Sequence, residues 1–194
     1  MIGFIGGSGL YALPGLEEVK EHVIETPFGK PSGPIVRGFL KNNPVAFLPR
    51  HGQHHQFLPS EINFKANIWA LKKVGVSHIV SISAVGSLSE EIAPGDLAVV
   101  GQYIDWTRGK RESTFFGKGV IAHVSMAVPT CPELSQHLLE TAKKESSKVH
   151  SFKTYACVEG PRFGTRAESH FLRASKAHLV GMTHIPEAFL AREA

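Results

Sequence analysis

Cysteine is scarce in this chain of 194 residues, and that scarcity excludes a disulfide framework. Only Cys131 and Cys157 are present, in different segments and without CxxC spacing. A small disulfide-rich scaffold or a zinc ribbon would need more cysteines at characteristic distances. We therefore expect two free thiols in a reducing compartment.

Long apolar runs and long runs of one charge sign are missing too. No stretch approaches the roughly 18 apolar residues of a membrane span, and the opening MIGFIGGSGL lacks the basic start and apolar segment of a signal peptide. The net charge of +4 comes from scattered Lys and Arg residues, not from the basic stripe of a nucleic-acid binder. We expect a cytoplasmic protein that binds neither membrane nor nucleic acid; a mild positive field suits a small anionic substrate.

What the chain does contain is an alternation of apolar strand patterns and amphipathic helix patterns. This order predicts an α/β fold, with a mostly parallel central sheet flanked by helices in a single domain, residues 1–194. The expected strands are 2–5, 45–48, 78–88, 97–100, 152–158 and 178–182; the expected helices are 60–74, 132–145, 165–175 and 186–194; and 101–131 is expected to be a surface excursion. Ser60 is the expected N-cap of the first helix. The last helix reaches Ala194 without a cap or closing strand, so we expect the chain to lack the last part of its fold.

A glycine-rich segment follows the first strand. Residues 7–12 fit the dinucleotide pattern G-x-G-x-x-G/A, but Pro14 and Gly15 would break the helix that this pattern requires. Three interpretations stay open: an anion cradle that uses the Ser8 hydroxyl, a plain tight turn, and a dinucleotide site.

The second notable segment is LPRHGQHHQF, residues 48–57, which holds three of the 11 histidines. A metal site is disfavoured because Arg50 brings a fixed positive charge, and we expect none. An anion site uses the arginine, whose guanidinium can bind two oxygens at once, while His51 adds a donor or a proton. RHG is also the nucleophile motif of histidine phosphatases, and a solvated loop is the remaining alternative.

Several polar residues share a position just after a predicted strand. In a parallel sheet such positions gather at one edge, where ligands of α/β proteins bind. They would form an oxyanion pocket beside a pocket with one apolar face; small residues there for close packing are the alternative. These residues are Ser8, Arg50, His51, Ser83, Ala84, Met182 and Thr183.

Taken together, the segments resemble the trimeric purine nucleoside phosphorylase family, and specifically its methylthioadenosine phosphorylase branch. The resemblance runs in family order over nearly the whole chain. It is carried by IGFIGGSGL, ETPFGKPS, LPRHGQHHQFLP, NFKANIWALKKVGVSHIVSISAVGSLSEEIAPGD, VEGPRFGTRAES and GMTHIPEAFLAREA. It implies that inorganic phosphate, as co-substrate, attacks C1′ of a purine nucleoside and that the purine leaves, without metal or organic cofactor. It also implies a homotrimer or a dimer of trimers.

The resemblance assigns site residues by position. Phosphate would be held by Ser8, Arg50, His51, Ser83, Ala84 and Thr183. The nucleoside would meet Met182 at the ribose, His55 near the sugar, Phe163 and Gly164 at the base, and His123 from a neighbouring subunit.

Three departures from the family pattern bear on substrate choice. The family's base-recognition and base-protonating residues lie beyond the position of Ala194, so no catalytic residue is assigned. Gly164 stands where the methylthioadenosine enzymes have serine, and Gly181–Thr183 resembles the methylthioinosine branch. The expected reaction is phosphorolysis of S-methyl-5′-thioadenosine; the alternatives are a methylthioinosine or 6-oxopurine phosphorylase, a histidine phosphatase, and an inactive phosphate-binding remnant.

Overall fold

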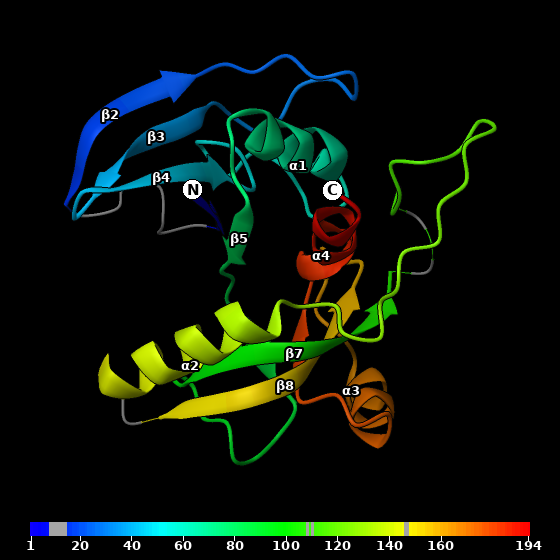
Figure 1. Cartoon of the computed structure of the whole chain (residues 1–194). Helices are drawn as coiled ribbons and strands as arrows, with labels where there is room; N and C mark the ends of the chain where they lie inside the picture. The colour runs from blue at the N-terminus through cyan, green and yellow to red at the C-terminus, as the bar shows by residue number, and fades with distance from the viewer. Residues whose placement is uncertain (8–14, 108, 110, 146–147) are drawn as a thin grey trace.

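The computed structural model describes residues 1–7, 15–107, 109, 111–145 and 148–194. Two β-sheets lie on either side of the C-terminal helix (Figure 1). The α/β class expected from the sequence is confirmed. The described strands form two sheets, however, and not the one central sheet that the sequence predicts.

The first sheet has the strand order β2-β3-β4-β1-β5. β1 lies between β4 and β5 and runs parallel to both, so the carboxyl ends of these three strands meet at one edge. β2 and β3 extend the sheet as antiparallel strands. The bounds are β1 Ile2–Gly6, β2 Leu16–His22, β3 Ile35–Leu40, β4 Asn43–Pro49 and β5 His78–Ser81.

The second sheet has the order β6-β9-β8-β7, with β7, β8 and β9 parallel and β6 antiparallel to β9. The bounds are β6 Gly86–Ser87, β7 Leu97–Trp106, β8 Val149–Val158 and β9 Leu179–Gly181. Residues 82–85 carry the chain from the first sheet to the second, which brings the end of β5 toward the end of β9.

The described residues form four helices: α1 Phe64–Lys73, α2 Pro132–Glu145, α3 Arg166–Ala174 and α4 His184–Glu193. α4 belongs to both halves of the molecule, because Leu190 is buried in the core of the first sheet and Ile185 in that of the second. The backbone of Ile185 is not helical, so the regular helix starts at Pro186, as the sequence predicts. This helix is therefore placed to carry side chains between the two sheets.

Some local expectations are wrong, for identifiable reasons. α1 is capped by Asn63, whose side chain accepts a hydrogen bond from the Ala66 amide, whereas Ser60 lies in a preceding turn. The strand expected over 78–88 breaks into β5 and β6 and is only half-buried, and β7 continues through 101–106, which the sequence assigns to the excursion. The sequence also misses the strands β2 and β3.

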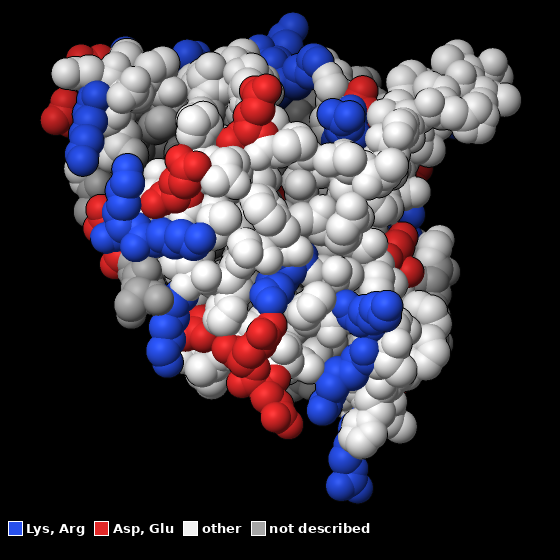
Figure 2. Space-filling view, turned by 60° about the horizontal axis from the view of Figure 1, so that its bottom comes forward, with Lys and Arg blue, Asp and Glu red and all other residues white. Residues whose placement is uncertain are grey.

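The surface mixes charges of both signs. Figure 2 shows Lys and Arg side chains interleaved with Asp and Glu over the face in view, with uncharged areas between them. Among the described residues, no helix is long and apolar enough to cross a membrane.

Candidate functional site

The ends of β4, β5 and β9 and the start of α4 bring polar side chains together between the two sheets. We call this group the strand-end cluster. Its members are Arg50, Ser81, Ser83, Thr183, His184 and Glu187. The convergence of strand ends that the sequence predicts is therefore present for Arg50, Ser83 and Thr183, whereas Ser8 lies outside the described residues.

Arg50 is fully buried, and a carboxylate neutralises its charge. Its Nε donates to Glu187 Oε2 at 2.9 Å and its Nη2 donates to Glu187 Oε1 at 3.0 Å. Ser81 Oγ accepts from Nη2 at 2.8 Å and donates to Glu187 Oε1 at 2.5 Å. The two guanidinium nitrogens that the sequence predicts to bind an anion together are thus occupied by Glu187.

The third guanidinium nitrogen, Nη1, bonds to a different group. Nη1 donates to the Ile82 carbonyl at 3.0 Å, and it is the nitrogen that a Cβ on Gly7 would approach, at 3.9 Å. Nη1 carries two hydrogens, and among the described residues one bond from it is seen. The second hydrogen is the one that Arg50 can offer to a ligand.

The pKa of Glu187 reflects this pairing. Burial alone would raise it, but the charge and the hydrogen bond of Arg50 outweigh burial and leave the pKa below its ordinary value. Glu187 is therefore ionised at neutral pH, and the pair as a whole is neutral.

His184 is a buried imidazole that contacts Ser83. Its ring stacks on the Tyr155 ring, with the centroids 4.5 Å apart and the planes at 8°. Its Nε2 lies 3.0 Å from Ser83 Oγ. Burial, with a smaller contribution from the charge of Arg50, lowers the pKa of His184 to about 4, so the ring is neutral at pH 7.

Two buried polar atoms of the cluster have no hydrogen-bond partner among the described residues: Thr183 Oγ1 and His184 Nδ1. The Thr183 backbone is fixed by its amide, which donates to Tyr155 Oη at 3.3 Å. That contact requires Gly181, because any Cβ there would collide with Tyr155 Oη. A buried hydroxyl without a well-placed partner costs stability, which makes Thr183 Oγ1 a candidate donor to a ligand.

His51 and His55 lie beside the cluster. Their rings are 4.4 Å apart, and His51 Nδ1 is 2.9 Å from the Phe57 carbonyl oxygen. Burial lowers the pKa of His51, so the ring is neutral at pH 7. Since a carbonyl only accepts, Nδ1 carries the proton and Nε2 is left as an acceptor.

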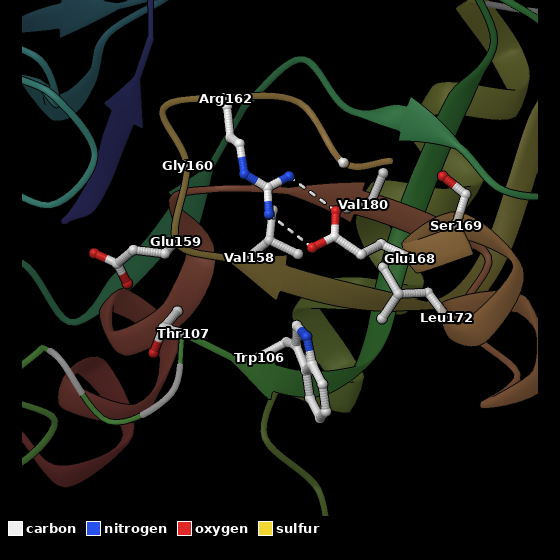
Figure 3. Close-up of a pocket in the computed structure, with 11 residues that line it drawn as sticks. Trp106, Thr107, Val158, Glu159, Gly160, Arg162, Glu168, Ser169, Leu172 and Val180 are labelled. Atoms are coloured by element: carbon white, nitrogen blue, oxygen red, sulfur yellow. Dashed lines mark hydrogen bonds and ion pairs between the residues drawn. The ribbon is translucent and has the colours of Figure 1, made fainter. Parts of the chain in front are cut away.

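A second feature is a pocket of about 230 Å³ on the far side of Met182. Its lining includes Trp106, Glu159, Gly160, Arg162, Gly164 and Glu168. Figure 3 shows Arg162 and Glu168 pointing toward each other, joined by bonds of 2.8 and 2.7 Å. The Arg162 contact is the largest of the effects that lower the pKa of Glu168 to about 2, so Glu168 is ionised at neutral pH.

Contacts of Met182 and Arg111 connect the pocket to the strand-end cluster. A Cβ on Gly160 would lie 2.5 Å from Met182 Sδ, so this methionine packs directly on the loop that borders the pocket. Arg111 donates to the carbonyl oxygens of Met182, Ile185 and Glu159 at 2.7, 2.7 and 2.9 Å. Sequence reasoning missed Arg111, Glu187 and the buried role of His184, because their partners lie 48 to 137 residues away.

The remaining predicted residues are exposed. Phe163 has 89% of its surface in solvent, and Ala84, Gly164 and His123 are also exposed. His123 lies on the excursion between β7 and α2, which extends away from the body of the molecule (Figure 1). The described contacts do not bring it to the strand-end cluster.

Comparison with known proteins identifies the family. Residues 1–194 match the Phosphorylase superfamily. S-methyl-5′-thioadenosine phosphorylase of Geobacter sulfurreducens is 52% identical over 194 residues, which cover 100% of this chain and 68% of that protein. The Thermococcus kodakarensis protein of the same name is 52% identical over 193 residues, or 99% of this chain and 73% of that protein. The chain belongs to the Phosphorylase superfamily, in its methylthioadenosine phosphorylase branch.

Solved structures agree with this phosphorylase assignment. A methylthioadenosine phosphorylase from an antarctic soil metagenomic library superposes with a TM-score of 0.94 at 51% identity, over 98% of this chain and 67% of that one. The Schistosoma mansoni enzyme in complex with adenine gives 0.92 at 39% identity, over 98% and 76%. Within the described part of this phosphorylase, no group of three or more His, Cys, Asp or Glu residues could hold a metal ion.

The Arg50–Glu187 pair generates a prediction about stability. Glu187→Gln removes the charge that neutralises a fully buried guanidinium, so the free energy of unfolding should fall by about 3 kcal/mol. Urea unfolding measures this. The control is Glu112→Gln, because Glu112 is 81% exposed beside Lys65; its effect should stay within about 1 kcal/mol. Equal, small changes in both variants would contradict the account of the buried pair.

Proposed function

We propose that this protein catalyses the phosphorolysis of S-methyl-5′-thioadenosine. A phosphate oxygen forms a bond to C1′ of the ribosyl group, and the glycosidic electron pair leaves with the purine, which takes up a proton. The products are adenine and 5-methylthioribose 1-phosphate. The observation that carries the proposal is the buried hydroxyl of Thr183, which has no partner among the described residues and lies at the converging strand ends of a chain from this enzyme branch.

Phosphate would bind at the strand-end cluster. Thr183 Oγ1 lacks a partner in the described structure, Ser83 Oγ contacts His184, the residue that follows Thr183, and Arg50 Nη1 has a hydrogen to offer. His51 Nε2, an acceptor, could receive the proton of monohydrogen phosphate. Ser8 and Ala84 remain proposals from the family pattern.

The charge state of the cluster suits a phosphate that acts as a nucleophile. Glu187 already neutralises Arg50, and His51 and His184 are uncharged at pH 7, so neutral donors would supply most of the binding. Phosphate would therefore keep its negative charge near C1′. That charge stabilises the positive charge that develops on the sugar as the glycosidic bond breaks.

The nucleoside would lie between the cluster and the neighbouring pocket. Met182, which packs on Gly160, would cover the sugar. The exposed ring of Phe163 would stack on the base beside Gly164, and His55, next to His51, would lie on the sugar side.

The direct test is an activity assay with the protein as its gene encodes it. With inorganic phosphate and S-methyl-5′-thioadenosine, we expect adenine release that depends on added phosphate. Hypoxanthine release from methylthioinosine serves as the comparison, and chromatography of the free bases measures both.

The outcomes separate the alternatives. Faster hypoxanthine release would indicate a methylthioinosine phosphorylase instead. Hydrolysis of a phosphomonoester without added phosphate, with a phosphohistidine at His51, would indicate a phosphatase. Phosphate binding with no base released would indicate a remnant, and would contradict the proposed activity.

Thr183 offers a test of the phosphate site itself. Thr183→Val keeps the side-chain shape but removes the buried hydroxyl, which has no partner in the described structure without a ligand. We expect the free protein to become more stable by up to about 1 kcal/mol and to bind phosphate about tenfold more weakly. Thermal unfolding and calorimetric titration with phosphate measure the two effects. Unchanged phosphate affinity would remove Thr183 from the site.

We also propose a cytoplasmic homotrimer, as the family resemblance implies, with His123 reaching a neighbouring subunit. The excursion that carries it exposes apolar side chains next in sequence, Val120 at 60% and Ile121 at 80%. Sedimentation should give three times the chain mass, and Ile121→Asp should shift the population toward smaller species. A wild-type monomer would contradict this proposal.

A further inference from the structure

We propose that His184 is a positioning residue that turns the Ser83 hydroxyl into a hydrogen-bond donor for phosphate. The inference rests on the proposed phosphate site and assigns a role to a side chain that does not itself touch the anion. It depends on which ring nitrogen of His184 carries the proton.

The surroundings of His184 decide between its two neutral forms. Nε2 is 3.0 Å from Ser83 Oγ, whereas Nδ1 is buried without a partner in the described part of the chain. A proton on Nδ1 would be a buried N–H donor without an acceptor, which folded proteins rarely tolerate. A proton on Nε2 leaves only an unused lone pair at Nδ1. The structure therefore favours the Nε2–H form.

This form fixes the direction of the bond to Ser83. Nε2–H donates, and Ser83 Oγ accepts. The serine keeps its own proton for a second bond, and an oxyanion at the strand ends is an acceptor for it. In the Nδ1–H form, Ser83 would instead donate its proton to His184 Nε2. Its oxygen would then face the anion with a lone pair and no hydrogen to donate.

The packing keeps the ring in this arrangement. Tyr155 stacks on one face of His184, and the Tyr103 ring meets it edge-on, with the centroids 6.0 Å apart. The low pKa of His184 keeps the ring from taking a second proton at neutral pH. His184 also follows Thr183 directly in the chain, so one backbone segment places both the unpartnered hydroxyl and the ring that orients Ser83.

The test is a double-mutant cycle on phosphate affinity, with the protein as its gene encodes it. His184→Phe keeps the stacked ring and removes both nitrogens, and Ser83→Ala removes the hydroxyl. By calorimetric titration with inorganic phosphate we expect each single variant to bind about five- to tenfold more weakly. The double variant should bind as weakly as Ser83→Ala alone, because His184 acts only through Ser83.

A conservative variant separates orientation from packing. The Nε2 of His184→Gln can occupy roughly the place of the imidazole Nε2, so it should recover phosphate affinity to within about twofold of wild type. His184→Asn is the matched control, because its shorter amide cannot reach Ser83, and it should stay weak. Recovery by neither variant would overturn the role of the donated hydrogen bond.

The failures can be told apart. If the wild-type protein binds no phosphate, both the proposed site and this inference are overturned. If it binds phosphate and His184→Phe binds equally well, or if the losses from His184 and Ser83 multiply in the double variant, only the inference is overturned. Nitrogen NMR of the His184 ring should show Nε2 protonated, and a protonated Nδ1 would also overturn it.

Discussion

The ion pair between Arg50 and Glu187 holds the site together. It joins the end of β4 to the first turn of α4, which are 137 residues apart in the chain. α4 in turn packs into the cores of both sheets through Leu190 and Ile185. Because a buried charge is stable only when it is matched, the positions of β4, α4 and the β5 end at Ser81 depend on one another. The strand ends are thus held at fixed spacing before any ligand arrives.

This constraint also shapes the chemistry. A guanidinium whose fork is filled by a carboxylate no longer dominates the electrostatics of the site. In the proposed phosphate site, an anion would therefore be bound mainly by the hydroxyls of Ser83 and Thr183, with the remaining Nη1 hydrogen of the paired Arg50. In the described part of the chain the Thr183 hydroxyl has no partner, which costs stability in the free protein. Functional sites commonly carry such costs, because a group satisfied within the protein would have nothing to offer a ligand.

The sequence predicts where the strands end, but not which side-chain pairs hold those ends together. The runs before Arg50, Ser83 and Met182 are apolar and strand-like, and parallel strands place their ends at one edge, so that convergence was predictable. β2 was missed because its sequence, LEEVKEH, forms an exposed strand without an apolar face. In the sequence, Glu187 resembles any acidic residue in the first turn of a helix. Only the folded chain shows that it pairs with Arg50, from the other half of the sequence. Long-range pairs of this kind leave no local pattern.

The central claim is that the strand-end cluster is a phosphate site assembled in advance and completed by the anion. The most direct measurement is a crystal structure of the protein soaked with inorganic phosphate. The account predicts a phosphate within hydrogen-bond distance of Thr183 Oγ1 and Ser83 Oγ, with the Arg50–Glu187 pair intact. A phosphate bound elsewhere, or an Arg50 that leaves Glu187 to take the anion with its fork, would contradict it.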